Sequence, residues 1–228
     1  MVNKKNAFWQ ALIAAVLIFD LGLMLGVYME NSRTGFIESS LLNSEINSVD
    51  QQLLQQINSN FDIDCKLAEA KLIKFADQIY EEAQTLEKYD ESTDLTTTLK
   101  TLHKRYDLLR TLLWIQSTEL KKTCNSSYNI IVYIYQYTDA TVETRSEQSA
   151  FSRYLSDLKN EYGSKIILIP IAGDTGLDSL NLAVESYNIK NYPGVILNNK
   201  QVIRNLEDLS TLKNIIKNSQ FSIPLTLP

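Results

Sequence analysis

One short segment constrains the fold of this chain more than any other, because it joins a proline to two strand-like runs. The apolar run Val195–Leu197 is typical of a buried strand, and Asn198–Lys200 supplies turn residues before a second strand at Gln201–Ile203. Pro193 stands at the mouth of the first strand, although a proline has no N–H to donate to a sheet. A cis peptide bond before Pro193 explains this position better than a trans proline that starts an edge strand.

The surrounding residues predict an α/β domain at 125–218. A β-branched and aromatic run at 129–136 and an apolar run at 165–171 predict two more strands. Apolar residues at helical spacing predict three helices, at 144–162, 179–187 and 206–218. The order strand-helix-strand-helix-strand-strand-helix predicts a central sheet with helices on both faces, built from a right-handed parallel crossover and a hairpin.

This order resembles that of the thioredoxin superfamily. In that family the pattern Tyr-x-Ile-x-x-x-Pro leads into the last two strands, and here it reads from Tyr187 through Ile189 to Pro193. The resemblance covers about Tyr128 to Asn218 and implies a thioredoxin-like fold in which Pro193 is cis and faces the family's redox site. The complete layout also resembles membrane-anchored thioredoxin-like proteins of archaea, in which a helical hairpin precedes such a domain.

The family's pair of active-site cysteines is missing. The family carries Cys-x-x-Cys where the first strand leads into the first helix, and Asp139 and Val142 occupy those two positions here. The family nucleophile is a thiolate of low pKa at the helix N-terminus, so the resemblance implies the fold without the thiol chemistry. We expect Asp139 to cap the helix, and we expect the groove beside Pro193 to be able to hold an extended peptide. No residue is assigned a catalytic role.

An apolar stretch at 7–29 predicts a transmembrane helix. It is about 30 Å long as a helix, which is enough to cross a bilayer. Two lysines precede it and a glutamate follows it, so we expect residues 1–6 in the cytoplasm and the remainder of the chain outside. A cleaved signal peptide is the rival interpretation, but Leu25–Tyr28 offers no convincing small-residue cleavage site.

Two features of this stretch suggest a helical partner in the membrane. Gly22 and Gly26 form a G-x-x-x-G motif, which allows two helices to approach closely, although glycines are common in membrane helices. Asp20 is costly in lipid and such residues usually face a partner or water. Together they predict packing against another helix, possible also between two copies of the chain, and they do not identify the partner.

The region 30–124 is predicted to be helical. Residues 34–59 are loosely amphipathic and suit a stalk, a partner-seeking helix or, better, a solvated helix packed on its own domain. Two longer helices follow at 64–89 and 95–122, with Asp62 or Asp64 available as the N-cap of the first. Because the break between them is short, we expect an antiparallel hairpin.

The hairpin predicts a disulfide bond. Cys65 opens its first helix and Cys124 closes its second, so antiparallel pairing brings the two cysteines together. On an oxidising side of the membrane they are expected to join, closing a loop of about 60 residues, worth on the order of 4 kcal/mol. Two unpaired buried thiols are the alternative, and a redox-active pair is a third, although closely spaced cysteines are absent.

Composition and isolated motifs exclude several kinds of site. The formal net charge of −5 gives no basic footprint for nucleic acid, and two distant cysteines with the single His103, on a charged helical stretch, cannot build a structural zinc site. No metal or cofactor is expected. Asp174-Thr175-Gly176 occurs once, whereas aspartic proteases need two facing aspartates. Asn125-Ser126-Ser127 fits the N-glycosylation pattern.

Three functions remain open from the sequence. The first is a redox-inactive, membrane-anchored thioredoxin-like module that binds a protein partner outside the cytoplasm. The second is a thiol–disulfide oxidoreductase or isomerase that uses Cys65 and Cys124. The third is an accessory subunit of a membrane complex, docked through the transmembrane helix. Residues 219–228 are expected to form a tail.

Overall fold

A computed structural model of the chain describes residues 8–10, 12–28, 45–46, 49–50, 52–54, 64–90 and 97–219. The chain divides into two units, residues 1–51 and 52–228, which are described separately. Four predicted parts lie wholly or mostly outside the described residues: the cytoplasmic tip, the helical stretch 34–59, the break between the hairpin helices and the tail, of which only Ser219 is described, as the last residue of a helix.

The first unit contains the apolar N-terminal helix, Phe8–Tyr28. It has 21 residues and a mean hydropathy of 2.3, and among the described residues it is the one helix long and apolar enough to cross a membrane. A helix of this length and position has the properties of a membrane anchor or of a signal sequence.

The second unit contains the predicted helices and strands, within about three residues of the expected bounds. Its elements are α2 (Cys65–Asp90), α3 (Thr97–Cys124), β1 (Asn129–Tyr135), α4 (Val142–Tyr162), η1 (Gly163–Lys165), β2 (Ile166–Ala172), α5 (Asp178–Ser186), β3 (Gly194–Leu197), β4 (Gln201–Ile203), α6 (Leu206–Leu209) and α7 (Thr211–Ser219). One prediction was wrong in detail, because the last helix is divided at Ser210. The hydroxyls of Ser210 and Thr211 each donate to a carbonyl three residues earlier, which competes with the helical hydrogen bonds.

The four strands form one mixed sheet in the order β2-β1-β3-β4. Strand β1 pairs in parallel with β2, from Asn129 opposite Ile166 onward, and antiparallel with β3, where Ile134 lies opposite Gly194. Strand β4 completes the hairpin with β3. Because β1 is central and covered on both faces, its residues from Ile130 to Tyr135 are aliphatic or aromatic and do not alternate with charged or amide side chains.

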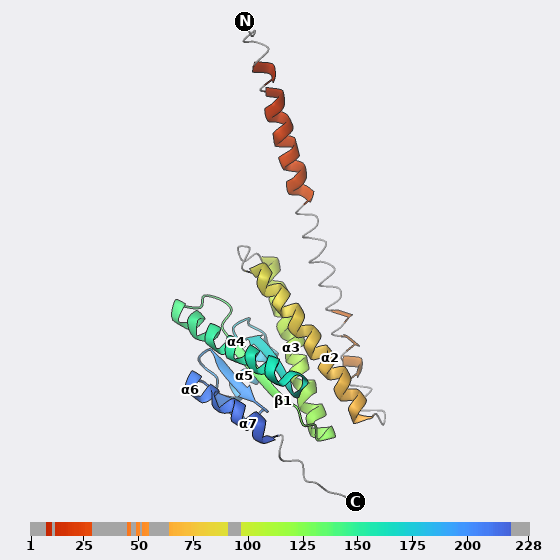
Figure 1. Cartoon of the computed structure of the whole chain (residues 1–228), viewed down its shortest axis with the longest axis vertical. Coiled ribbons are helices and arrows are strands. Elements are labelled where there is room, and N and C mark those ends of the chain that lie inside the picture. Colours follow the sequence, from red (N-terminus) through yellow and green to blue (C-terminus); the bar gives the residue numbers. More distant parts are fainter. Residues whose placement is uncertain are drawn as a thin grey trace, which may run out of the picture. The chain divides into compact units, whose positions relative to one another are not determined.

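Helices cover both faces of this sheet (Figure 1). Alternate β1 residues point to opposite faces, Ile131 and Tyr133 to one and Ile130 and Val132 to the other. The first face packs against α4, α6 and α7, through Phe151, Leu155, Leu158, Leu209, Leu212 and Ile216. The second packs against α5 and also against α2 and α3, through Leu72, Phe75, Ile79, Leu109, Leu113, Trp114, Leu180 and Val184.

The hairpin therefore belongs to the core of the α/β domain. The predicted boundary between a helical region ending at 124 and a domain starting at 125 does not separate two cores, because α2 and α3 share one with the sheet. The physical reason is that α5, with nine residues, is too short to cover this face of the sheet alone. The hairpin therefore buries the rest of the face. The Trp114 indole fixes the contact by donating to Asn199 Oδ1 at 2.6 Å, in the turn between β3 and β4.

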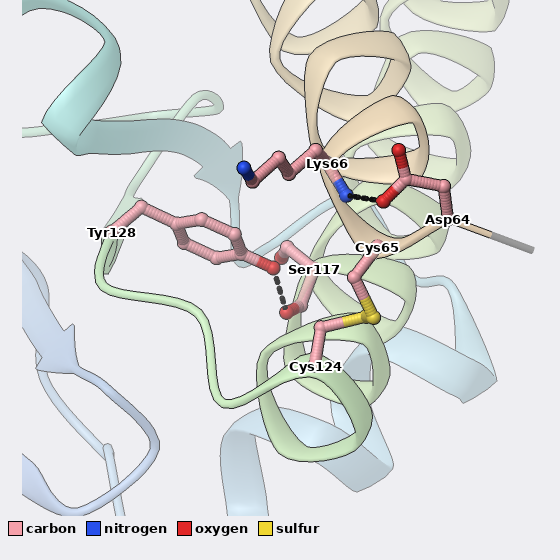
Figure 2. The surroundings of a disulfide bond; sticks show 6 residues. All are labelled: Asp64, Cys65, Lys66, Ser117, Cys124 and Tyr128. Atoms are coloured by element: carbon pink, nitrogen blue, oxygen red, sulfur yellow. Dashed lines mark hydrogen bonds between the residues drawn. A yellow bond between two sulfur atoms is a disulfide. The ribbon is translucent and has the colours of Figure 1, made fainter. Parts of the chain in front are cut away.

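The predicted disulfide bond between Cys65 and Cys124 is confirmed, with a Cα–Cα distance of 5.6 Å (Figure 2). Asp64, one of the two predicted caps, accepts a hydrogen bond from the Lys66 backbone N–H at 3.0 Å at the start of α2 (Figure 2). Beside the disulfide, the Tyr128 hydroxyl donates to the Ser117 carbonyl at 2.7 Å. These contacts fasten the open end of the hairpin to the amino end of β1.

Candidate functional site

The candidate site lies where β1 and β2 end. Because the two strands are parallel and adjacent, the loops that follow them, 136–141 and 173–177, leave the sheet at the same edge. Pro193 immediately precedes Gly194, which pairs with Ile134 near the end of β1, and the Tyr192–Pro193 peptide bond is cis. The topology thus brings Pro193 to the edge of the sheet that carries the β1–α4 loop.

Asp139 and Val142, which the sequence resemblance aligns with the cysteines of the thioredoxin superfamily, also lie at this edge. Asp139 is exposed in the β1–α4 loop with φ of 51°, and Val142 is the first residue of α4 with 71% of its surface exposed. The expectation that Asp139 caps α4 was wrong. Thr141 is the cap, and its Oγ1 accepts from the Thr144 N–H at 3.2 Å. Asp139 precedes the N-cap position by two residues and has a left-handed conformation, whereas Thr141 is extended as an N-cap residue must be.

The residues Ala172–Asp174, which we call the junction, connect this edge to three other segments. The Ala172 N–H donates to Asp107 Oδ1 of α3 at 3.2 Å. The Gly173 N–H donates to the carbonyl of Tyr135, the last residue of β1, at 2.8 Å. The Gly173 carbonyl accepts from the Tyr192 hydroxyl at 2.8 Å. The junction therefore holds the hairpin, the end of β1 and the residue before Pro193 in one place.

Asp174 fixes the loop that follows β1. Its Oδ1 accepts from the Tyr137 N–H at 2.8 Å, and its Oδ2 accepts from the N–H and hydroxyl of Thr138 at 2.7 and 2.5 Å. Both carboxylate oxygens are thus occupied by the loop. This explains the Asp174-Thr175-Gly176 sequence as a structural clamp and gives no support to protease chemistry.

Gly173 is required by close packing. A Cβ at this position would lie 2.5 Å from Cε1 of the Tyr192 ring and 2.7 Å from Cγ2 of Ile134. The Tyr192 ring therefore lies directly over the backbone of the junction. Burial, with a smaller contribution from Asp174, raises the pKa of the Tyr192 phenol, so the hydroxyl remains a donor to Gly173.

Three polar side chains of α3 are buried beside the junction. His103, Asp107 and Arg110 expose 5%, 0% and 3% of their surface. Arg110 Nη1 donates to Asp107 Oδ1 at 3.0 Å, and the His103 ring stacks on Tyr137 with centroids 3.9 Å apart. The Arg110 guanidinium also lies 5.9 Å from the centre of the Tyr106 ring. Charged residues are almost never fully buried without such partners.

Burial dominates the electrostatics of this cluster. It raises the pKa of Asp107 to about 6, because desolvation outweighs the opposing effects of Arg110 and of the Ala172 N–H, and Asp174 adds to the rise. Burial acts to lower the pKa of Arg110, but Tyr135 and Asp107 outweigh it, so the net shift is upward and Arg110 stays a cation. Asp107 Oδ2 and Arg110 Nε find no hydrogen-bond partner among the described residues.

This cluster was not predicted from the sequence. His103 was expected on a charged helical stretch, whereas its ring is buried. The signal was present in the spacing: His103, Asp107 and Arg110 recur every three or four residues on the same side of α3 as the predicted apolar positions. Polar residues within an apolar stripe mark a buried interaction, because leaving a charge unpaired there would be costly.

The other predicted site residues lie elsewhere. The disulfide lies near the amino end of β1, and the seven residues of that strand span about 20 Å, so neither Cys65 nor Cys124 belongs to the site. Asn125 is exposed with φ of 49° after the end of α3, where the Ser126 N–H donates to the Lys121 carbonyl at 3.2 Å. Asparagine suits this helix-ending conformation, which accounts for the residue independently of glycosylation.

The small and acidic residues of the N-terminal helix lie on different faces. At about 100° per residue, Gly22 and Gly26 are about 40° apart, whereas Asp20 is about 200° from Gly22. Both glycines are open on the helix surface, since a Cβ added at either would meet nothing within 4 Å. A helix packed through Gly22 and Gly26 would therefore not contact Asp20.

No family model and no curated protein matches this chain. Among the residues that the structure describes, no group of three or more His, Cys, Asp and Glu side chains could hold a metal ion. The site is therefore interpreted from its own geometry.

Proposed function

We propose that this chain is a membrane-anchored, thioredoxin-like protein that binds a protein partner outside the cytoplasm and performs no thiol–disulfide exchange. The observation that carries the proposal is Pro193, cis and beside the end of β1, while the adjacent loop and helix start have Asp139 and Val142 where the family has cysteines. The strand order β2-β1-β3-β4, with helices on both faces, supports a thioredoxin-like fold.

The segment before Pro193 favours an extended peptide as the ligand. Asn191 and Tyr192 form no backbone hydrogen bonds with one another or with other described residues, so their N–H and C=O groups can pair with an added strand. The Tyr192 side chain is held by Gly173, which orders this segment before a partner arrives. The exposed Val142 offers an apolar contact for a side chain of the peptide.

The N-terminal helix and the disulfide support the proposed location. Phe8–Tyr28 is long enough to span a bilayer, and disulfides persist on oxidising sides of membranes. In this proposal the N-terminus is inside and residues 31–228 are outside. Protease added to intact cells, or to spheroplasts where a wall is present, is then expected to digest the α/β domain. Digestion only after the membrane is breached would reverse this topology.

Site-specific photo-crosslinking tests the binding surface. A photoreactive amino acid at Val142 in the full chain is expected to form covalent adducts that contain one recurrent protein segment, identified by mass spectrometry. The same group at the exposed Ser164, before the amino end of β2, serves as the matched control. Equal adducts at both positions, or none at Val142, would contradict a partner site beside Pro193.

The accessory-subunit function is a second candidate, supported by the N-terminal helix. Its glycine face and its acidic residue point in different directions, so a membrane complex could contact the helix from two sides. Replacing Gly22 and Gly26 by Ile is expected to abolish such packing without changing the Val142 adducts. Loss of the Val142 adducts in that variant would favour the accessory function over a partner bound at Pro193.

A further inference from the structure

The buried side chain of Asp107 connects the hairpin to the junction. Its Oδ1 accepts two hydrogen bonds, from Arg110 Nη1 at 3.0 Å and from the Ala172 N–H at 3.2 Å. Ala172 is the last residue of β2, and the next residue, Gly173, holds Tyr192 before Pro193. The Asp107 carboxyl group of α3 is thus linked to the proposed peptide site through Ala172 and Gly173.

The geometry of Asp107 disfavours its charged form. The side chain is fully buried, and its Oδ2 has no hydrogen-bond partner among the described residues. A carboxylate in water accepts hydrogen bonds on both oxygens, so burying it with one oxygen bare is costly. A proton on Oδ2 removes the negative charge and much of this cost, while Oδ1 can still accept from Ala172.

We propose that Asp107 is a positioning residue through which the hairpin holds the junction, and with it the surface at Pro193, more firmly when its carboxyl group is protonated than when it is ionised. Ionisation favours a locally open state in which Asp107 reaches water and the Ala172 hydrogen bond is broken. The consequence for peptide binding rests on the proposed function, whereas the coupling of α3 to the junction does not.

The neighbouring groups support this direction. On α3 itself, Arg110 favours the ionised carboxyl and His103 lies one turn away. From the loop after β2, Asp174 opposes ionisation, and β1 contributes Tyr135, which interacts with Arg110. Helix α2 presents apolar side chains to this core, Phe75 and Ile79 among them. Desolvation outweighs the attraction of Arg110, so the buried carboxyl holds its proton to a higher pH than an exposed one.

Hydrogen–deuterium exchange of the full chain in nanodiscs tests the proposal. After correction for intrinsic exchange rates, peptides covering the junction and residues 136–141 are expected to exchange about tenfold faster at pH 7.5 than at pH 5. This factor follows from moving a carboxyl pKa between about 6 when buried and 3.8 when exposed. Asp107→Asn, neutral at both pH values, is expected to abolish the pH effect.

A matched aspartate serves as the control. Asp77 on α2 is half exposed and paired with Lys159 at 2.8 Å, so Asp77→Asn is expected to retain the pH effect at the junction. An equal pH effect in wild type and Asp107→Asn would overturn the proposal, as would no effect in wild type. If Asp107→Asn does not fold, the wild type decides: a change confined to the two segments supports the proposal, and a uniform change over all peptides overturns it. None of these outcomes depends on whether a peptide binds at Pro193.

Discussion

The two ends of the sheet are held to the helical hairpin by different chemistry. At the amino end of β1, the hairpin is closed by the Cys65–Cys124 disulfide and by the Tyr128 hydroxyl on the Ser117 carbonyl. At the carboxyl end of β1, it is held by Asp107 on the Ala172 N–H. At the first end neither the disulfide nor the hydroxyl–carbonyl hydrogen bond depends on a carboxyl group, and Lys121 Nζ also donates there to the carbonyls of Ser126 and Tyr128. The second depends on a buried carboxyl group, which makes the proposed binding edge the adjustable one.

Removing the disulfide is the largest change available at the amino end. Cys65→Ser with Cys124→Ser is expected to lower the free energy of unfolding by about 4 kcal/mol, because the unfolded chain regains the freedom of a loop with a sequence separation of 59. Chemical denaturation at pH 5 and pH 7.5 measures it. A loss that differs strongly between the two pH values would contradict a pH-independent contribution of the disulfide bond itself.

Gly173→Ala is expected to have the next largest effect, at the carboxyl end. The added Cβ would meet the Tyr192 ring at 2.5 Å, and such overpacking costs about 1–3 kcal/mol. Because Tyr192 must move, the Val142 photo-adducts should also decrease. Gly163→Ala is the control: φ of 56° makes it strained, but nothing lies within 4 Å and it lies at the other end of α4. If the yield of Val142 adducts is unchanged in Gly173→Ala, the position of Tyr192 does not affect partner binding.

The pH dependence of stability is a smaller effect. The folded-state pKa of Asp107, about 6, lies above its ordinary value of 3.8, so this group stabilises the fold at low pH and the contribution is lost as pH rises through 6. Between pH 5 and pH 7.5 the loss is about 1.4 kcal/mol, equal to a tenfold change. Chemical denaturation at both pH values should show that the free energy of unfolding falls more with rising pH in the wild type than in Asp107→Asn. An equal change in the two proteins would rule out this contribution of Asp107.

The sequence predicted the elements well and their assembly less well. Strand β1 and the Val195–Leu197 run are recognisable from local composition, and the disulfide follows from the lengths of two helices and the places of Cys65 and Cys124. The packing of α2 and α3 on the sheet could not be predicted from periodicity. An apolar helix face shows that the helix is buried on one side, but it does not identify the surface on which it packs.

Two residues of the candidate site were predicted from local sequence patterns, whereas the junction beside them was not. Pro193 and Val142 were identified from the pattern before the last strands and the helix start after the first, which are local signals. The junction depends on contacts between residues far apart in sequence, such as Asp107 with Ala172 and Tyr137 with Asp174. Only the polar residues within the apolar stripe of α3 hinted at them.

Insulin reduction tests most directly whether this protein lacks the thiol–disulfide exchange of the thioredoxin superfamily, as we propose. The full chain in nanodiscs, supplied with dithiothreitol, is expected to give no turnover above the reagent alone, because both cysteines are joined at the opposite end of β1. The Cys65→Ser, Cys124→Ser variant is expected to give the same rate. Turnover by the wild type that disappears in this variant would contradict the account and assign the protein to thiol–disulfide exchange.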